Sequence, residues 1–206
     1  MTSRILLATR NPQKLAELRR IVAPQLAGVD VIGLDDVAPY EELPETGETF
    51  AENALLKARE AFTQTGLPSI ADDSGLAVEA LNAMPGVLSA RWSGRHGDDL
   101  ANLSLVLGQL ADVPDERRRA AFVCAAAYID ATTELVTEGR MPGRLINEPR
   151  GQNGFGYDPI FVADGNDMTN GELAPERKDE ISHRGIALRS LVAAIAATDR
   201  LEGPRP

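Results

Sequence analysis

The order of its apolar segments constrains the fold of this chain more than any other feature of the sequence. Ile5–Ala8 is an apolar run typical of a strand, and it leads through a polar turn into an amphipathic helix that contains Leu15, Leu18 and Val22. Helix and strand patterns alternate in this way early in the chain, whereas strand patterns cluster later. That order predicts an α/β fold with a mixed sheet flanked by helices.

Local signals indicate where several of these elements begin and end. Asn11 followed by Pro12 is a strong helix start, with asparagine as the N-cap and proline at the first helical position. Thr49 and Glu52 have the spacing of a capping box, and Gly66 is suited to end the helix that they begin. The other predicted elements are a short buried strand at 69–71 that ends in Asp72-Asp73-Ser74-Gly75, a helix after Asp98 with the stripe Leu100, Leu103, Leu107 and Leu110, strands at 120–129 and 134–137 joined by a turn at 130–133, a strand at 159–162, and a last helix with Leu188, Leu191, Val192 and Ile195.

The composition excludes several classes of protein. The chain has 206 residues, of which 31 are acidic and 21 basic, and the formal net charge of -10 opposes binding to nucleic acid or to an anionic membrane. No apolar run approaches the roughly 20 residues of a membrane span, and the N-terminus lacks an export signal. We therefore expect a cytoplasmic protein with one domain over residues 1–200 and a frayed tail over 201–206. The single cysteine, Cys124, lies in an apolar run and predicts a buried structural thiol.

Two segments in the first third of the chain are candidates for binding phosphate. The first is the turn Thr9-Arg10-Asn11-Pro12-Gln13-Lys14, because N–H groups at a helix start, with Arg10 and Lys14 beside them, attract phosphate oxygens. An ordinary capped helix with solvated basic side chains fits the same pattern, and the chain contains no Walker motif. On the next predicted helix, Asn53 and Lys57 lie one turn apart on one face, where the lysine can neutralise a phosphate; an exposed polar stripe is the alternative.

Two adjacent carboxylates, Asp72 and Asp73, follow a predicted buried strand and form a candidate metal site. Oxygen-only ligands suit Mg²⁺. Neighbouring side chains on an ideal strand face opposite ways, so we expect only one of the two to enter the site directly. A turn formed by Asp-Ser-Gly is the alternative. Ser74 is not expected to be a nucleophile, because the Gly-x-Ser-x-Gly elbow is absent.

The segment Gly154-Phe155-Gly156-Tyr157-Asp158 combines two glycines, two aromatic residues and an acid immediately before an apolar run. Such a loop can lay the flat ring of a purine on an aromatic face and contact the edge of the ring through a carboxylate or backbone groups. Lys178 and the pair His183-Arg184 can hold phosphate and the edge of a base. The alternatives are a turn that leads into a strand for the first segment and exposed surface residues for the His-Arg pair.

Taken together, these segments closely resemble the inosine/xanthosine triphosphate pyrophosphatase family over nearly the whole chain. Arg10 stands where many relatives carry glycine, which can alter how the triphosphate enters the turn, and Trp92 stands where tyrosine is frequent. Six motifs in order carry the resemblance: Thr9-x-Asn11-x-x-Lys14, Glu45-Thr46-Gly47-x-Thr49-Phe50-x-Glu52-Asn53-Ala54-x-x-Lys57-Ala58, Ala71-Asp72-Asp73-Ser74-Gly75-Leu76, Ser89-Ala90-Arg91-Trp92-Ser93-Gly94, Phe155-Gly156-Tyr157-Asp158-Pro159-Ile160-Phe161 and Ser182-His183-Arg184-Gly185.

The resemblance implies an elongated mixed sheet flanked by helices in two lobes, with the nucleotide in the cleft between them, and a homodimer. It also implies Mg²⁺-dependent hydrolysis of the non-standard purine nucleotides ITP, dITP and XTP to the monophosphate and pyrophosphate, which cleanses the nucleotide pool. Glu45, Asp73 and Asp72 would bind the metal, and Asp73 would accept the proton of the attacking water. Because a carboxylate bound to Mg²⁺ is a poor proton acceptor, either Asp72 shares this task or the metal-bound water is itself acidic enough. The candidate substrate contacts are Thr9, Arg10, Asn11, Pro12, Gln13, Lys14, Asn53, Lys57, Ser74, Arg91, Phe155, Gly156, Tyr157, Asp158, Lys178, His183 and Arg184.

The candidate residues fit the chemistry of this reaction, and the sequence argues against three other functions. Negative charge grows on the departing pyrophosphate, where Lys14, Lys57 and Lys178 can stabilise it together with Mg²⁺. Donors aimed at the 6-oxo group of inosine and xanthosine would disfavour ATP. A non-catalytic nucleotide sensor would not need the acidic cluster. A pyrophosphatase of the septum-formation inhibitor group and a Nudix hydrolase would show Ser-x-Ser-x-x-Arg and Arg-Glu-x-x-Glu-Glu motifs that the sequence lacks.

Overall fold

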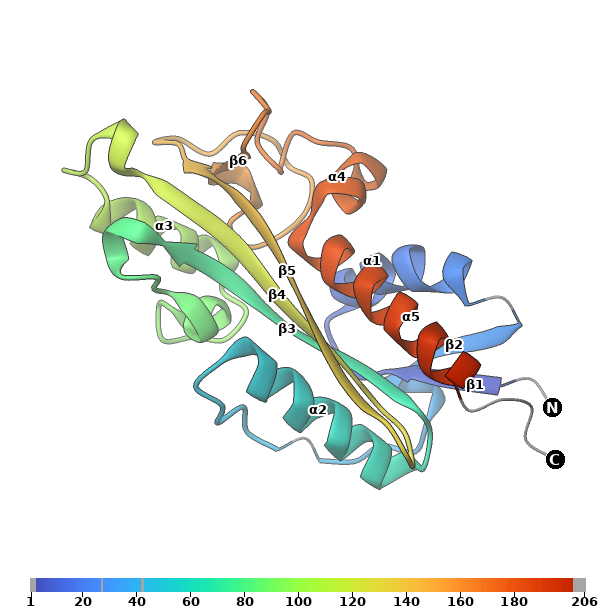
Figure 1. The fold of residues 1–206 in the computed structure, drawn as a ribbon. Helices are drawn as coiled ribbons and strands as arrows, with labels where there is room; N and C mark the ends of the chain where they lie inside the picture. Colours follow the sequence, from blue (N-terminus) through green and yellow to red (C-terminus); the bar gives the residue numbers. More distant parts are fainter. Residues whose placement is uncertain (1–2, 27, 42, 202–206) are drawn as a thin grey trace, which may run out of the picture. The chain divides into compact units, whose positions relative to one another are not determined.

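The computed structural model describes residues 3–26, 28–41 and 43–201, and it contains a mixed sheet flanked by helices, as predicted (Figure 1). The strands are β1 (Ser3–Leu7), β2 (Val29–Gly33), β3 (Ser69–Val78), β4 (Arg119–Ile129), β5 (Glu134–Leu145) and β6 (Phe161–Ala163). The helices are α1 (Pro12–Val22), α2 (Phe50–Thr65), α3 (Asp99–Gln109), α4 (Pro175–Ile181) and α5 (His183–Leu201). Short 3₁₀ helices are η1 (Ala23–Gln25), η2 (Leu34–Asp36), η3 (Glu79–Leu81), η4 (Gly86–Arg91), η5 (Asp115–Arg117) and η6 (Asp158–Ile160).

The six strands are hydrogen-bonded in the order β2-β1-β3-β4-β5-β6. β1 pairs in parallel with both β2 and β3, whereas β5 and β6 are antiparallel, so the sheet is mixed. The chain divides into two compact units: unit 1 consists of Met1–Asp73, Cys124–Gly139 and Arg184–Pro206, and unit 2 of Ser74–Val123 and Arg140–His183. The single domain over 1–200 stays a prediction, and all of the predicted frayed tail except Leu201 lies outside the described residues.

β1 and the part of β4 that belongs to unit 1 are apolar on both faces because helices cover both faces. Ile5 and Leu7 share a core with α1 and α5, while the alternate residues Leu6 and Ala8 share a core with α2. The part of β4 in this unit repeats the alternation. Strands buried on both faces are nearly continuous apolar runs, which is the pattern that the sequence shows at these positions. Unit 1 is therefore a three-layer α/β/α structure (Figure 1).

Capping residues place the first two helices as predicted. The Asn11 side chain caps α1, and Pro12 occupies the first helical position. Thr49 and Glu52 form a reciprocal capping box at the start of α2. Gly66 ends α2 in the left-handed conformation, with a φ of 67°.

Two element boundaries differ from the prediction. β3 does not end at Asp72 but continues through the acidic pair to Val78, so the interpretation of this segment as a turn is wrong. Cations from the neighbouring helices make a strand possible there, as described below. β5 extends from Glu134 to Leu145, well beyond the predicted 137. The prediction ended too early because exposed and buried residues alternate along β5, whereas β4 is marked by a continuous apolar run.

Two further details of the prediction from the sequence are wrong. Leu100 is 75% exposed on α3 and does not belong to the buried stripe. The strand predicted from Pro159 begins only at Phe161, because Asp158–Ile160 forms η6. The fixed φ of proline suits the first turn of a helix, and proline has no backbone N–H that could donate a hydrogen bond in a sheet.

Two expectations from composition concern Cys124 and the membrane. Cys124 is fully buried, and burial raises the pKa of its thiol, as expected of a structural cysteine. No helix within the described ranges is both long enough and apolar enough to cross a lipid bilayer.

Gly75 marks a close approach between β3 and η4 in unit 2. A Cβ atom built on Gly75 would overlap the Ser89 Oγ atom and the Gly86 carbonyl oxygen. Ser89 Oγ accepts from the Leu76 N–H at 2.9 Å and donates to the Gly86 carbonyl at 2.6 Å, so moving it would cost two hydrogen bonds. We expect Gly75→Ala to lower the free energy of unfolding by about 1–3 kcal/mol, the usual cost of overpacking.

Gly108 in α3 supplies the matched control, because a Cβ atom built there has no neighbour within 4 Å. Alanine is the better helix former, so Gly108→Ala should raise the free energy of unfolding by roughly 0.5–1 kcal/mol. Urea unfolding measures both variants. The same change in both would show that the space around Gly75 is not restricted.

Candidate active site

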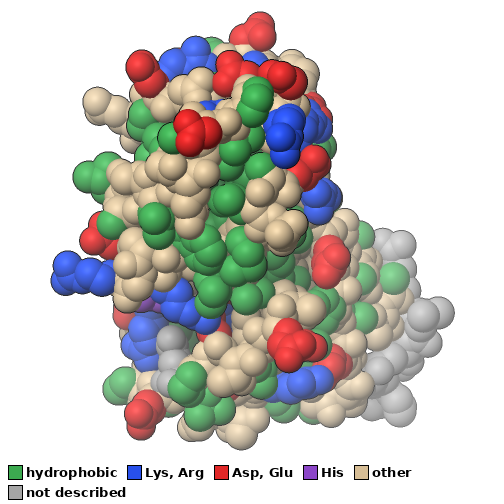
Figure 2. Space-filling model, turned by 90° about the vertical axis from the view of Figure 1, so that its left-hand side faces the viewer, with side chains coloured by type: hydrophobic (Ala, Val, Ile, Leu, Met, Phe, Trp, Pro, Cys, Tyr) green, Lys and Arg blue, Asp and Glu red, His purple; other side chains and the backbone are tan. Residues whose placement is uncertain are grey.

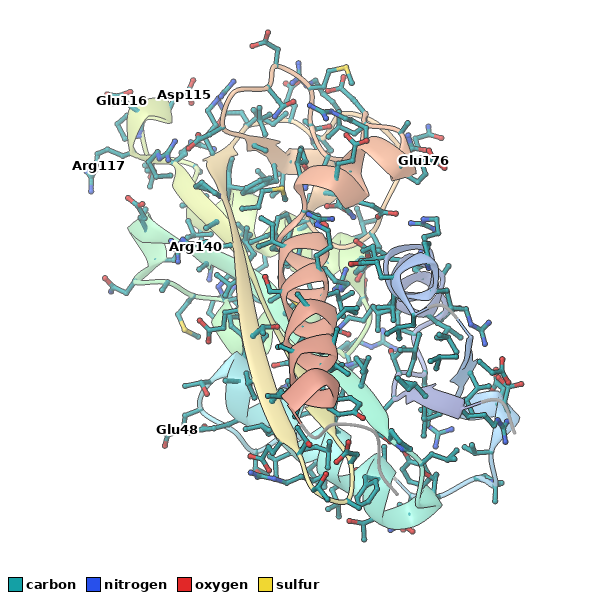
Figure 3. The ribbon with its side chains drawn as sticks, turned by 45° about the vertical axis from the view of Figure 1, so that its right-hand side comes forward. Glu48, Asp115, Glu116, Arg117, Arg140 and Glu176 are labelled. Carbon is teal, nitrogen blue, oxygen red and sulfur yellow. The ribbon has the colours of Figure 1, made fainter. Side chains whose placement is uncertain are left out.

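Charged side chains of this protein are normally exposed, as the six residues labelled in Figure 3 illustrate. These are Glu48, Asp115, Glu116, Arg117, Arg140 and Glu176. Five charged candidates from the sequence are buried instead: Asp72, Asp73, Asp158, Lys178 and Arg184. A buried charge without a partner is strongly unfavourable, so each is expected to be paired. The pairs form one cluster in each unit.

Arg184, at the start of α5, connects three segments of unit 1. Its guanidinium group donates through one terminal nitrogen to Glu17 of α1 and through Nε to Asp72 of β3, the latter at 3.1 Å. Asp72 also accepts from Lys14 Nζ at 3.2 Å. Burial acts to raise the pKa of Asp72, but the positive charges of Lys14, Arg184 and Lys57 hold it well below its ordinary range. Asp72 is therefore an ionised carboxylate that fixes the position of Lys14.

Asp73 meets α2 on the other face of β3. Asn53 Nδ2 donates to Asp73 Oδ2 and Lys57 Nζ donates to Asp73 Oδ1, both at 3.2 Å. Lys57 Nζ also donates to Glu45 Oε1 at 2.8 Å, so two carboxylates from distant segments converge on one ammonium group. The Gly47 N–H donates to Asn53 Oδ1 at 2.8 Å, which ties the segment that carries Glu45 to α2.

The two adjacent aspartates face opposite sides of β3, as predicted, and their environments differ. Burial raises the pKa of Asp73 and Glu45 acts in the same direction, while Lys57 and Lys14 only partly oppose them. Burial acts to lower the pKa of Lys57, but the charges of Asp73, Asp72 and Glu45 outweigh it, so this pKa is raised. Asp73 is therefore the more basic of the two aspartates, and Lys57 stays protonated.

The turn at the start of α1 uses most of its own amide groups. The N–H groups of Gln13 and Lys14 donate to Asn11 Oδ1 at 2.9 and 3.1 Å. The Asn11 N–H donates to Thr9 Oγ1 at 3.2 Å. These amides were the reason for expecting phosphate here, and they are engaged within the turn. A phosphate at this turn would therefore depend on side chains, above all on Lys14.

Three other candidates are Arg10, Ser74 and Arg91. Arg10 is exposed, and its guanidinium donates to the Tyr40 carbonyl at 2.9 Å within unit 1. Ser74 is half-buried on β3, directly after Asp73. Arg91 is half-buried as the last residue of η4.

Asp158 organises the cluster of unit 2. Its Oδ2 atom accepts from Lys178 Nζ at 2.7 Å and from the Phe155 N–H at 2.9 Å, and its Oδ1 atom accepts from Asn170 Nδ2 at 3.2 Å. Lys178 Nζ also lies 5.1 Å from the centroid of the Phe155 ring. A Cβ atom on Gly154 would overlap the Asp158 carboxylate, so the loop is folded tightly around it. Both Asp158 oxygens thus bind groups of the protein itself.

The next two residues of this loop are held by other elements of unit 2. The Gly156 N–H donates to Asp99 Oδ2 of α3 at 2.8 Å, and the Tyr157 hydroxyl donates to the Ser89 carbonyl at 2.9 Å. Tyr157 is buried, whereas Phe155 is half-buried and presents the aromatic side chain of the loop that remains partly exposed.

His183 is also buried, so the interpretation of the His-Arg pair as exposed surface residues is wrong. The exposed fraction of His183 is 4% and that of Arg184 is 1%. The His183 ring stacks on Phe122 of β4, with 4.8 Å between ring centroids and 12° between the planes. The two residues belong to different units, His183 to unit 2 and Arg184 to unit 1.

The sequence interpretation missed Glu17 and Asp99. Glu17 lies one helical turn before the buried Ile21, so an acidic residue on the apolar face of α1 was the signal for a buried ion pair. Asp99 follows the N-cap Asp98, and nothing in the sequence distinguishes it from an ordinary acidic residue in a first helical turn.

Glu45 and Asp73 offer the oxygen ligands that Mg²⁺ prefers, and they already converge on one cation, Lys57. In the part of the chain that the structure describes, no group of three or more His, Cys, Asp or Glu side chains is arranged to hold a metal ion. Mg²⁺ is usually held by one or two carboxylates together with waters and substrate phosphates, so this pair fits a site that substrate completes. Asp72 fits less well, because its carboxylate is directed to Lys14 and Arg184.

Known proteins share both the sequence and the fold. Residues 5–194 match the model of the Ham1 family. A dITP/XTP pyrophosphatase of Mycolicibacterium paratuberculosis is 60% identical over 203 residues, which cover 98% of this chain and 100% of that protein. The crystal structure of a nucleoside-triphosphatase / dITP/XTP pyrophosphatase from Mycobacterium abscessus is 60% identical, covers 91% of this chain and 98% of its own, and has a TM-score of 0.74. The structure of a HAM1 protein from Coxiella burnetii is 41% identical, covers 95% of this chain and 99% of its own, and has a TM-score of 0.84.

Proposed function

Because this chain belongs to the Ham1 family, we propose that it is a nucleoside triphosphate pyrophosphatase that hydrolyses dITP, XTP and ITP to the monophosphate and pyrophosphate. Relatives named dITP/XTP pyrophosphatases support the first two substrates. The reaction would remove non-standard purine nucleotides from the cytoplasmic pool before they enter DNA or RNA. The observation that carries the proposal is the convergence of Glu45 and Asp73 on Lys57 within unit 1.

Mg²⁺ is part of the proposal, with Glu45 and Asp73 as its protein ligands. Without it, the charges of the unit 1 cluster would repel a triphosphate, since three cations face four carboxylates. When bound, the ion would neutralise phosphate charge and lower the pKa of its bound water. The side chains counted are Lys14, Lys57, Arg184, Glu17, Glu45, Asp72 and Asp73.

Asp73 is the proposed proton acceptor for the water that attacks the α-phosphorus. Asn53 and Lys57 orient its two oxygens, whereas the Asp72 carboxylate is directed to Lys14 and Arg184. Lys14, which Asp72 holds in place, and Lys57 would stabilise the negative charge that develops on the departing pyrophosphate.

The loop of residues 154–158 in unit 2 is proposed to hold the purine base, and we call it the base loop. Phe155 supplies a partly exposed aromatic face, and Lys178 beside it supplies positive charge. Selection would come from N–H donors aimed at the 6-oxo group of hypoxanthine or xanthine. The 6-amino group of adenine would leave such donors unpaired, which is costly in a buried site.

A panel of nucleoside triphosphates assayed with Mg²⁺, with pyrophosphate and orthophosphate quantified separately, tests this function. We expect pyrophosphate as the product, and kcat/KM for dITP, ITP and XTP at least roughly 100-fold above that for ATP. Orthophosphate as the first product would contradict cleavage at the α-phosphorus. Equal pyrophosphate release from ATP would contradict the proposed base selection.

We also propose that the protein forms a homodimer. Figure 2 shows hydrophobic side chains gathered on the face that it presents, with charged side chains of both signs around them. Contiguous apolar surface on a protein commonly marks a site of association, which supports this proposal.

A further inference from the structure

Three successive residues of the base loop are each held by a separate contact. The Phe155 N–H donates to Asp158 Oδ2 at 2.9 Å, and the Tyr157 hydroxyl donates to the Ser89 carbonyl at 2.9 Å. Between them, the Gly156 N–H donates to Asp99 Oδ2 at 2.8 Å. The Phe155 contact is formed within the loop, whereas Asp99 holds the loop backbone from a different element, α3.

The loop needs such contacts because glycine makes it flexible when it is not held. Gly154 and Gly156 have φ values of 73° and 61°, in the left-handed region that glycine adopts readily. Glycine also loses more conformational freedom on ordering than other residues do. A carboxylate that accepts from the Gly156 amide is a charge-assisted hydrogen bond, which is among the stronger contacts available to a loop.

Asp99 is not required as the cap of its own helix, because its neighbour Asp98 performs that task. Asp98 Oδ1 accepts from the Ala101 N–H at 3.2 Å. Asp99 is directed toward the loop instead. Burial is the main cause of the raised pKa of the Tyr157 hydroxyl, and the negative charge of Asp99 acts in the same direction.

We propose that Asp99 is a positioning residue that holds the base loop in the conformation that binds substrate, through the Gly156 amide. This inference rests on the proposed function, because it assigns the loop to the base of the nucleotide. Asp99 acts on Phe155 through the loop backbone and does not itself need to touch the substrate. It should therefore affect substrate binding more than the chemical step.

The test compares three variants of the full chain. In Asp99→Ala, KM for dITP should rise roughly fivefold to tenfold and kcat should change by less than about twofold, since a uniform binding contribution is lost. Inhibition by inorganic tripolyphosphate, which has no base, should be unchanged. Asp99→Asn keeps an oxygen that can accept from the Gly156 N–H, so its KM should lie close to that of the wild type.

Asp98→Ala is the matched control, because it removes the cap of α3 without touching the loop. Its KM should stay within about twofold of the wild type. An equal rise of KM in Asp98→Ala and Asp99→Ala would mean that α3 stability alone matters, and would overturn the proposal. Hydrogen exchange of the Gly156 amide, measured by NMR without substrate, should be faster only in Asp99→Ala. Unchanged exchange there would also overturn the proposal, whereas a wild-type protein that does not hydrolyse dITP would overturn the proposed function instead.

Discussion

Asp73→Asn is expected to lower kcat for dITP by about 10³-fold while the protein still binds the nucleotide, because a carboxamide cannot accept the proton of the attacking water. The substitution also replaces one acceptor oxygen by an NH₂ group. Both oxygens of Asp73 accept hydrogen bonds, from Lys57 and from Asn53, so one of these contacts must be lost. Pyrophosphate release with Mg²⁺ measures the rate, and calorimetry with dITP measures binding.

Asp130→Asn is the matched control for this change in unit 1. Asp130 lies between β4 and β5 and accepts hydrogen bonds from Thr132, Thr133 and Tyr128. The same chemical change there should leave kcat within about twofold of the wild type, since Asp130 is assigned no part in the reaction. Turnover close to normal in Asp73→Asn would remove Asp73 from the mechanism.

The parts of the fold that the sequence predicted correctly depend on local signals. The caps at Asn11 and Thr49 and the left-handed Gly66 act within a few residues, so their effect can be read without knowledge of the tertiary structure. The acidic pair in β3 is different. Two adjacent aspartates argue for a turn unless cations from other helices lie against both faces of the strand, and the sequence does not say which helices do so.

The candidate site shows the same limit. The residue types that carry charge were identifiable, but their partners were not, because a buried ion pair depends on which elements lie side by side. Glu17, the buried partner of Arg184, was missed for this reason. Contact between the loop of Asp158 and the edge of a base, through a carboxylate or backbone groups, stays a prediction. The sequence did not indicate that the Asp158 oxygens bind Lys178, Asn170 and a loop amide.

The buried network around Arg184 leads to the second large effect. In Arg184→Met the carboxylates of Glu17 and Asp72 would lose the buried cation between them. Removing one partner of a buried ion pair usually lowers the free energy of unfolding by about 3–5 kcal/mol, because an uncompensated charge remains in the interior. Neutralising Glu17 as well, in the double variant Arg184→Met with Glu17→Gln, should recover part of that loss. Urea unfolding of the wild type, the single variant and the double variant measures the loss and the recovery.

Arg59→Met is the control, since it breaks an arginine pair of the same unit that is exposed. The Arg59 and Glu134 side chains are 52% and 46% exposed, and exposed pairs contribute at most about 1 kcal/mol. A similar loss in Arg59→Met and Arg184→Met would show that burial does not decide the strength of these contacts.

The loss in Arg184→Met should also depend on pH, which separates charge from packing. In the wild type the pKa of Asp72 is held below its ordinary value, so its ionisation stabilises the fold above about pH 4 and this contribution is lost as the pH falls further. Without Arg184 the folded protein favours the charged form of Asp72 less. The difference in free energy of unfolding between wild type and Arg184→Met should therefore be largest near neutral pH and shrink as the pH falls through about 4. A difference that stayed constant over this range would mean that Arg184 stabilises unit 1 through packing of its side chain and not through its charge.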